Sequence, residues 1–230
     1  MMTDNEKVSV LMSSYNSQKT LKDSINSVLT QTYKNFEFLI IDDNSSDDTL
    51  KILKDFENID ERIRVYKNSR NIGLTKSLNI LIDKSVGKYI ARQDADDISK
   101  PERLDVQYNY LRNSSFRCCT SRATIKNSRK KIPRFSHLLP NELVIKYKNP
   151  FIHGTLFVEK EVITDIGGYS EKFKYAQDYK LFSDMYSKNY KVKILDNLLY
   201  ELNMENNISS NKKSEQEFYA KHVKKGTTPN

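Results

Sequence analysis

The chain of 230 residues contains little cysteine, glycine or proline and no tryptophan. Its two cysteines, Cys118 and Cys119, are neighbours and cannot close a useful loop, which excludes a disulfide scaffold and favours a reducing compartment. Six glycines and five prolines are too few for a collagen-like or linker-dominated chain. The composition therefore indicates a globular protein, which we expect to be cytoplasmic.

Long apolar runs are also absent. The longest, Phe38 to Ile41, is far shorter than the roughly 20 residues that a membrane-spanning helix needs. The opening residues, Met1 to Lys7, are polar and acidic and show no signal-peptide pattern. Because 37% of the residues are hydrophobic, the chain can form one packed domain. We expect any association with a membrane to be peripheral, at its cytoplasmic face.

Basic residues outnumber acidic ones 38 to 30, a net charge of +8 that suggests an anionic partner. The excess is concentrated in residues 117–134, which contain no acidic residue. This stretch is either a solvated loop or a surface for phosphate or anionic lipid, and a peripheral membrane contact could involve it or the C-terminal tail. We find no nucleic-acid-binding module or aromatic platform, so nucleic acid is not the expected partner.

The spacing of apolar residues predicts alternating strands and helices in the first hundred residues. Expected strands cover 8–12, 36–41, 63–66 and 89–91, and expected helices cover 21–29, 50–56 and 74–82. Nearly continuous apolar strands that alternate with helices are typical of a parallel sheet covered on both faces. The sequence therefore predicts an α/β fold with a mainly parallel sheet and flanking helices.

The second half of the chain is less regular. A helix is expected after Pro101, strands over 116–125, 156–158 and 192–202, and further helices over 162–166 and 179–185. From Asn206 onward, Asn, Ser and Lys dominate, which predicts a loose tail over 206–230. One domain of residues 1–205 followed by this tail is the expected organisation.

Polar side chains follow three of the predicted strands, at Ser14-Tyr15-Asn16, at Asp42-Asp43 and at Asp94 to Asp97. Ligands of parallel sheets bind beyond the carboxyl ends of the strands, so these residues predict one crevice that contains several carboxylates. One of Asp42 and Asp43 could cap the next helix, while the other could accept a hydrogen bond from a base. Tyr15 could stack on a nucleobase or be a half-buried loop residue.

Asp94-Ala95-Asp96-Asp97 is the strongest local signal for chemistry. In an extended segment, Asp94 and Asp96 would face one ligand together while Asp97 points elsewhere. Crowded carboxylates repel unless a cation joins them, and oxygen ligands suit Mg²⁺ or Mn²⁺ that also holds phosphates. The alternative is a solvated acidic turn in which Asp97 caps the following helix.

The ordered series of motifs resembles the inverting family 2 glycosyltransferases of the GT-A fold, over about residues 7–210. The segments that carry the resemblance are 8–16, 27–32, 40–45, 71–74, 87–97, 101–104, 167–169 and 177–182. It implies a nucleotide-binding half over about 7–100 and an acceptor half over 101–205.

The resemblance also implies residue roles. Tyr15 and Asp43 resemble the pair that recognises uracil, Asp94 would lie near the ribose, Asp96 would ligate the metal ion, and Asp178 is similar to the catalytic base. Further nucleotide contacts are implied for Ser14, Asn71, Lys76 and Ala95, and contacts on the acceptor or donor-sugar side for His153, Gly168 and Gln177. For His153, a structural hydrogen bond is the alternative.

The sequence departs from the family pattern at two places. Gln177 stands where the family has Glu before its base, which leaves Asp178 intact. Leu202 and Met204 stand where family members often carry Arg-x-His, whose His helps to bind metal or diphosphate. Either diphosphate capture is weaker, or the basic stretch 126–134 replaces the lost residues, or the protein is impaired.

We therefore expect a metal-dependent, inverting hexosyltransferase of polysaccharide biosynthesis, with a UDP-linked sugar as donor, a glycan or lipid-linked acceptor, and Mn²⁺ or Mg²⁺ as cofactor. One alternative is a catalytically impaired protein that binds nucleotide sugars. Another is a sugar nucleotidyltransferase, which would need a Gly-rich, Arg-containing loop after the first strand. Residues 13–19 contain no glycine, which counts against the second alternative.

Overall fold

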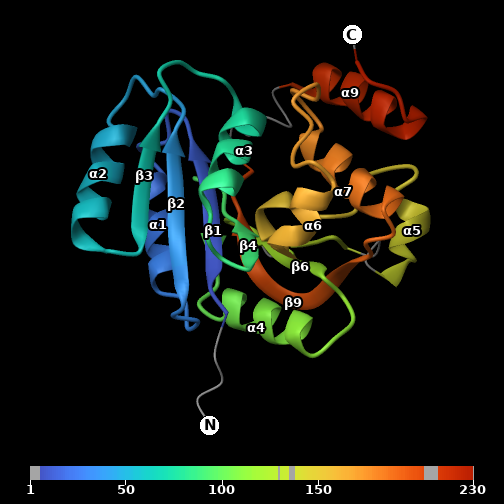
Figure 1. Cartoon of the computed structure of the whole chain (residues 1–230), viewed down its shortest axis with the longest axis horizontal. Coiled ribbons are helices and arrows are strands. Elements are labelled where there is room, and N and C mark those ends of the chain that lie inside the picture. The colour runs from blue at the N-terminus through green and yellow to red at the C-terminus, as the bar shows by residue number, and fades with distance from the viewer. Residues whose placement is uncertain (1–5, 129, 135–137, 205–211, 230) are drawn as a thin grey trace.

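A mixed sheet runs through the centre of the molecule, with helices packed on both faces (Figure 1). The computed structural model describes residues 6–128, 130–134, 138–204 and 212–229. Within them the strand order is β3-β2-β1-β4-β8-β6-β9-β5, and β7 pairs with β6 at the side of this path. The predicted α/β fold class is confirmed.

The first half forms the parallel part of the sheet. The strands β1 (Val8–Ser14), β2 (Phe36–Asp42), β3 (Ile63–Lys67) and β4 (Tyr89–Arg92) are joined by α1 (Leu21–Leu29), α2 (Thr49–Ile59) and α3 (Leu74–Lys84). Every residue of β2 is buried, which explains its nearly continuous apolar sequence. The predicted elements of this half are confirmed.

The second half extends the sheet with strands of both directions. β8 (Phe157–Glu159) runs antiparallel to β4 and to β6 (Cys118–Ile125), and β6 runs parallel to β9 (Val192–Leu202). The short strands β5 (Ile98–Ser99) and β7 (Lys131–Ile132) pair with β9 and β6. The helices are α4 (Arg103–Arg112), α5 (Asn141–Val144), η2 (His153–Thr155), α6 (Lys160–Asp165), α7 (Gln177–Ser187) and α9 (Lys213–Lys225).

Two apolar clusters hold the layers together, one on each face of the sheet. Alternate residues of β1 enter different clusters: Leu11 packs with α3, α6 and α7, whereas Val10 and Met12 pack with α1, α2 and α4. This alternation follows from the strand, in which successive side chains point to opposite faces. The polar ends of the strands are left at the edge of the sheet, where the site forms.

The predicted loose tail is wrong for residues 213–225, which form α9 beside α7 (Figure 1). The ring of Tyr219 lies edge-on against Phe173 and Tyr175, and Val223 is buried. Tyr219 and Val223 are four residues apart, so a helix places both on one side even though the segment is polar in composition. Residues 206–211 of the predicted tail lie outside the described residues.

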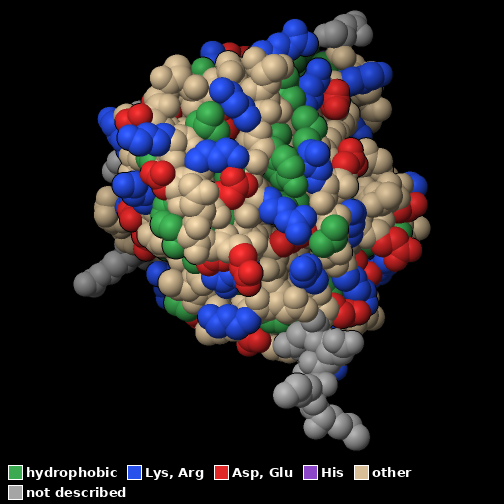
Figure 2. Space-filling view, turned by 60° about the vertical axis from the view of Figure 1, so that its left-hand side comes forward, with side chains coloured by type: hydrophobic (Ala, Val, Ile, Leu, Met, Phe, Trp, Pro, Cys, Tyr) green, Lys and Arg blue, Asp and Glu red, His purple; other side chains and the backbone are tan. Residues whose placement is uncertain are grey.

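Basic and acidic side chains are interspersed on the face of the molecule that Figure 2 shows. On the face that lies to the left of Figure 1, near α2 and β3, Lys and Arg side chains alternate with Asp and Glu (Figure 2). In the basic stretch 117–134, Arg117 is paired with Glu159 at 2.6 Å and also with Glu161. No helix in the described ranges is both long and apolar enough to cross a bilayer.

Candidate active site

The carboxyl ends of β1, β2 and β4 bring the predicted polar clusters together. Ser14 lies opposite Asp42 in the β1–β2 register, and the Asp43 N–H donates to the Ser14 carbonyl at 2.8 Å. The Gln93 N–H donates to the Leu11 carbonyl at 3.0 Å, so the Asp94 segment leaves the sheet beside them. The predicted crevice edge is therefore built from three neighbouring strand ends.

Asp43 organises the loop before α3. Its side chain is buried, and Oδ1 accepts from Asn68 Nδ2 at 2.8 Å and from the Ile72 N–H at 2.9 Å, while Oδ2 accepts from the Gly73 N–H at 2.8 Å. Gly73 has a φ of 88°, a conformation that favours glycine. The loop presents the exposed Asn71, and the exposed Lys76 follows in α3.

Neither Asp42 nor Asp43 caps α2, so that prediction is wrong. Asp42 accepts from the Ser45 N–H at 3.2 Å within the loop, and the Thr49 N–H that opens the helix donates to Asp47 at 3.0 Å. The N-cap of α2 is Asp48, five residues beyond Asp43, so the strand-end carboxylates lie too far from the helix start to cap it.

Ser14 and Tyr15 offer two different groups at the end of β1. The Ser14 hydroxyl is buried, and its oxygen has no hydrogen-bond partner among the described residues. Leaving such a group unpaired costs about 1–3 kcal/mol, which a polar ligand atom would recover. Tyr15 is 51% exposed and presents its ring to solvent, as a stacking residue requires.

Residues 94–97 form a turn, so the predicted extended segment is wrong. The Asp97 N–H faces the Asp94 carbonyl at 3.4 Å. The buried Gln93 side chain holds this turn, because its Nε2 donates to the carbonyls of Asp94 at 3.2 Å and Asp97 at 2.9 Å. Asp94 and Asp96 stay partly exposed, while Ala95 is buried and its carbonyl accepts from the Thr20 hydroxyl at 3.0 Å.

Asp97 is buried and does not cap the next helix, since α4 begins at Arg103. Its Oδ1 accepts the Asn203 N–H at 2.7 Å. Burial, with the charges of Asp94 and Asp96, raises the pKa of Asp97 to about 8. Burial and Asp94 raise the pKa of Asp96 to about 6, and the Lys126 ammonium partly offsets that rise. Burial and mutual repulsion thus disfavour the charged forms of Asp96 and Asp97, which a cation placed beside them would offset.

These carboxylates fit a divalent cation that is completed by a ligand. The described residues contain no group of three or more His, Cys, Asp or Glu side chains arranged to hold a metal ion. Mg²⁺ and similar ions are usually held by one or two carboxylates together with substrate phosphates. Asp96, beside Asp94, provides such a partial donor set.

Two buried arginines support the Asp94 segment, and the sequence reasoning missed both. Arg92 Nη2 contacts Asp94 Oδ1 at 2.5 Å, and its Nη1 donates to the Leu11 carbonyl at 3.1 Å. Arg103 Nη2 donates to the Arg92 carbonyl at 2.6 Å, and its Nη1 donates to Gln93 Oε1 at 3.1 Å. A charged residue at the end of an otherwise apolar strand was the available signal for Arg92.

The acceptor-side residues come from η2 and α7. Asp178 lies in the first turn of α7, and Asn149 Nδ2 donates to its Oδ2 at 2.7 Å. His153 Nε2 lies 2.6 Å from the Tyr169 hydroxyl, which is the structural hydrogen bond named as the alternative. Burial and Arg92 lower the pKa of His153 to about 4 against the opposing charges of Asp94 and Asp178. The charges of the strand-end Asp94 and of Asp178 on α7 therefore both act on His153.

The backbone of the acceptor-side segments packs closely against the nucleotide-side residues. A Cβ on Gly154 would lie 2.9 Å from Asp94 Oδ2, so the backbone of η2 packs directly on that carboxylate. Gly168 has a φ of 75° and precedes Tyr169, whose N–H donates to Asn79 Oδ1 at 2.9 Å on α3. Gln177 is the first residue of α7, next to Asp178.

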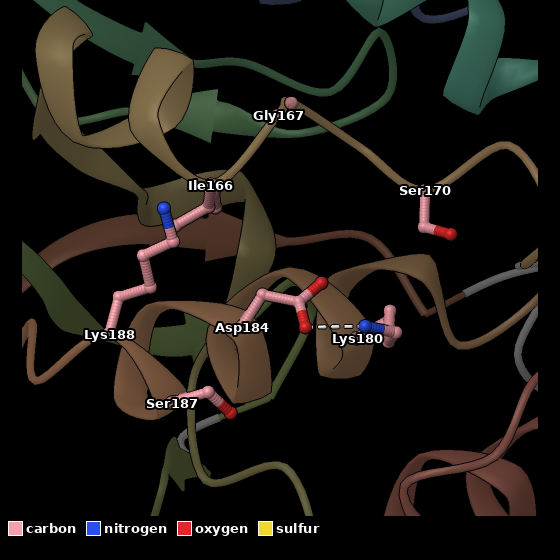
Figure 3. Close-up of a pocket in the computed structure, with 8 residues that line it drawn as sticks. Ile166, Gly167, Ser170, Lys180, Asp184, Ser187 and Lys188 are labelled. Carbon is pink, nitrogen blue, oxygen red and sulfur yellow. Dashed lines mark hydrogen bonds and ion pairs between the residues drawn. The ribbon is translucent and has the colours of Figure 1, made fainter.

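A cavity of about 410 Å³ lies on another side of α7 (Figure 3). Its charged lining residues are paired within the protein, Lys180 with Asp184 and Lys188 with Asp165 at 3.1 Å. At about 100° per residue, Lys180 and Asp184 project from the side of the helix opposite to Asp178. Gly168 also lines this cavity, but the charged residues of the cavity face away from Asp178, and we do not assign the cavity to the reaction.

The end of β9 replaces the expected Arg-x-His with Leu202 and the exposed Met204. The Lys126 N–H donates to the Leu202 carbonyl at 2.8 Å, and the Lys126 charge acts on Asp96. A lysine from the basic stretch thus lies beside the position where the basic pattern is missing.

Comparison with known proteins gives a consistent match. The family model described as "Glycosyl transferase family 2" matches residues 9–170. The chain is 32% identical over 206 residues to EpsE of Bacillus subtilis (strain 168), covering 87% of this chain and 74% of that protein. It is 34% identical over 183 residues to the O-antigen biosynthesis glycosyltransferase WbnJ of Escherichia coli, covering 77% and 70% of the two chains.

Solved structures show the same fold at lower identity. S. aureus TarS 1–349 in complex with UDP has a TM-score of 0.76 at 21% identity, covering 95% of this chain and 64% of that chain. The mannosyltransferase PcManGT from Pyrobaculum calidifontis, in complex with GDP-Man and Mn²⁺, has a TM-score of 0.79 at 17% identity, covering 99% and 67%. The chain thus spans less than two thirds of this TarS fragment.

Proposed function

The chain belongs to glycosyltransferase family 2, whose members transfer a sugar from a nucleotide-sugar donor, and we propose that it is an inverting, metal-dependent hexosyltransferase that uses a UDP-linked sugar. The observation that carries the proposal is that one segment, residues 149–154, contacts both carboxylates. Asn149 Nδ2 donates to Asp178 Oδ2 at 2.7 Å, and a Cβ on Gly154 would lie 2.9 Å from Asp94 Oδ2. The TarS complexes with UDP and UDP-GlcNAc, and the PcManGT complex with GDP-Man, support a nucleoside diphosphate sugar as donor.

The donor nucleotide is held at the ends of β1 and β2. The exposed ring of Tyr15 stacks on the base, and the Asp43 carboxylate accepts from a base N–H. The unpartnered Ser14 hydroxyl gains a polar partner from the nucleotide. Asn71 and Lys76 contact the nucleotide from the loop before α3 and its first turn, and the backbone of Ala95 closes its ribose side.

The diphosphate lies over the Asp94–Asp97 turn. Asp96, with Asp94 beside it, would hold Mg²⁺ or Mn²⁺, which when bound neutralises charge that develops on the leaving diphosphate. Lys126 adds a positive charge on the side where family members often carry Arg-x-His. The buried Arg92 fixes the position of Asp94 by the contact of its Nη2 with Asp94 Oδ1 at 2.5 Å.

Asp178 acts as the general base on the hydroxyl of a glycan or lipid-linked acceptor. Asn149 binds one carboxylate oxygen at 2.7 Å, and the second oxygen removes the acceptor proton. The acceptor oxygen then attacks the anomeric carbon from the side opposite the diphosphate and inverts its configuration. His153, Gly168 and Gln177 border the space in which the acceptor and the donor sugar meet.

Asp178→Asn tests this assignment, because the amide oxygen can still accept from Asn149 while the basicity is lost. The transfer rate should fall by at least about 10²-fold, with UDP affinity unchanged. Asp184→Asn is the matched control, since Asp184 lies on α7 but pairs with Lys180 away from the crevice. A rate above about a tenth of the wild-type value in Asp178→Asn would refute the assignment. UDP binding without transfer by the wild type would instead favour the impaired binding protein suggested by Leu202 and Met204.

A further inference from the structure

One group of exposed apolar side chains lies away from the donor crevice, around α5. The exposed fractions are 72% for Leu138, 57% for Leu139, 56% for Leu143 and 73% for Tyr147. We call these four residues the α5 patch. All four lie within ten residues of the sequence. The other large apolar side chains that are exposed in the described chain are not grouped in this way. Such patches mark interaction surfaces.

The backbone fixes the orientation of the α5 patch. The Val144 N–H donates to the Pro140 carbonyl and the Tyr147 N–H to the Val144 carbonyl, so the chain makes successive helical turns. Val144 and Ile145 are buried and anchor the inner side of these turns. Leu143 and Tyr147 are four residues apart and therefore share the outer side. In Figure 1, α5 lies at the right edge, at the end of the molecule opposite to α2.

Basic side chains border the patch. Lys146 and Lys148 are exposed within the same turns, whereas Lys191 is paired with Glu142 of α5 at 3.4 Å and adds no net charge. Apolar residues flanked by lysines match the surface of an anionic bilayer, in which acyl chains lie beneath negative headgroups. The basic stretch 117–134 fits this role less well, because Arg117 is paired with two glutamates and Lys126 lies near Asp96.

Hydrogen bonds connect the segment that carries the patch to the helix of the proposed catalytic base. The Tyr179 hydroxyl of α7 donates to the Ile145 carbonyl at 2.7 Å, and Asn149 donates to Asp178 at 2.7 Å. The segment that carries the patch thus also orients Asp178. A membrane bound at the patch would lie on the acceptor side of the crevice.

We propose that the α5 patch docks on an anionic lipid bilayer and thereby presents a lipid-linked acceptor to Asp178. The choice of acceptor rests on the proposed function, whereas the docking itself does not. A second copy of this chain fits the patch less well, because a symmetric pair would gather Lys146 and Lys148 of both copies at one interface. Four side chains are also small against the roughly 800 Å² that each partner of a stable complex buries.

Co-sedimentation with vesicles of phosphatidylcholine, with and without phosphatidylglycerol, tests the docking. The wild type should bind the anionic vesicles more tightly, and Leu143→Ser with Tyr147→Ser should weaken that binding by at least about tenfold. Lys146→Glu with Lys148→Glu should abolish the preference for anionic vesicles. The matched control is Ile59→Ser with Val86→Ser, which removes exposed apolar residues elsewhere and should bind like the wild type.

Absence of wild-type binding to anionic vesicles, or equal binding by the serine variant of the patch, would overturn the proposal. So would a wild-type dimer that the same variant dissociates in analytical ultracentrifugation, because the patch would then be an interface between copies. UDP affinity is measured on every variant and should not change. Failure of the wild type to bind UDP would refute the proposed function and leave the vesicle result standing.

Discussion

Gly154→Ala should damage donor binding through a single methyl group. Gly154 lies in η2, and its φ is outside the left-handed region, so the substitution acts through contacts and not through backbone strain. The new Cβ would lie 2.8 Å from the Tyr200 hydroxyl oxygen and 2.9 Å from Asp94 Oδ2. Ordinary contacts of a Cβ are 3.4–4 Å, so both neighbours would have to move by about half an ångström or more.

Neither neighbour can move freely. Tyr200 is fully buried, and its hydroxyl oxygen accepts the Asp94 N–H at 3.0 Å. Asp94 is held from the other side by Arg92 at 2.5 Å. Overpacking of this kind costs about 1–3 kcal/mol, which for a chain of this length lowers Tm by roughly 2–12 °C. Displacing a charge-assisted hydrogen bond of Asp94 should weaken UDP-sugar binding by about tenfold to a hundredfold.

Thermal unfolding and calorimetric titration with a UDP-sugar measure the two effects. Gly167→Ala is the matched control, because Gly167 has a φ of 81° and no atom within 4 Å of an added Cβ. This control should lower Tm through backbone strain without changing donor affinity. If Gly154→Ala binds the donor as tightly as Gly167→Ala does, the contact between η2 and Asp94 does not support the donor site.

Three further outcomes follow from the site. UDP affinity, measured by calorimetry, should rise when Mn²⁺ replaces a chelator, because the charge of Asp94 acts on Asp96 and a cation would relieve that repulsion. Equal affinity in both conditions would show that the metal ion does not help to bind UDP. Tyr15→Ala should weaken UDP binding by about 1–3 kcal/mol and leave the binding of inorganic pyrophosphate unchanged. Lys126→Ala should weaken the binding of both ligands relative to the exposed control Lys130→Ala, and the reverse pattern would refute the assignment of base and phosphate contacts. Gln216→Ala should lower the transfer rate more than it lowers UDP affinity, because Gln216 Oε1 accepts the N–H of the left-handed Ala176 at 3.0 Å just before Asp178. A transfer rate equal to that of the neighbouring exposed control Glu217→Ala would show that Gln216 does not help to position Asp178.

Most strands and helices that the sequence predicted are long enough to show a period, whereas the three-residue β8 was predicted from the continuous apolar run 156–158. Each strand of the parallel half has at least four residues, and each of its helices has at least nine. β5 and β7 have two residues each and α5 has four, which is too short for an apolar pattern. The helix α9 escapes prediction for another reason, because its composition is polar and few apolar residues, among them Tyr219 and Val223, mark its inner side.

The placement of the site at the strand ends could be predicted, but its internal contacts could not. Parallel strands end at one edge, which was enough to bring Ser14, Asp43 and Asp94 together. The turn at Asp94 depends on the side chain of Gln93, a tertiary contact with no local sequence signal. The hydrogen bond from Asn149 to Asp178 joins residues 29 positions apart and was equally hidden.

Strand pairing changes how the missing Arg-x-His pattern should be interpreted. Read along the chain, Leu202 and Met204 indicate a loss of positive charge near the diphosphate. In the parallel β6–β9 pair, however, Ile125 lies opposite Leu202, and the next residue, Lys126, brings its charge near Asp96. A lysine is a point charge that attracts phosphate but does not share the metal-binding chemistry of a neutral imidazole. The effect of Lys126→Ala on diphosphate binding should therefore persist in chelator, whereas a residue that acts through the metal would lose its effect there.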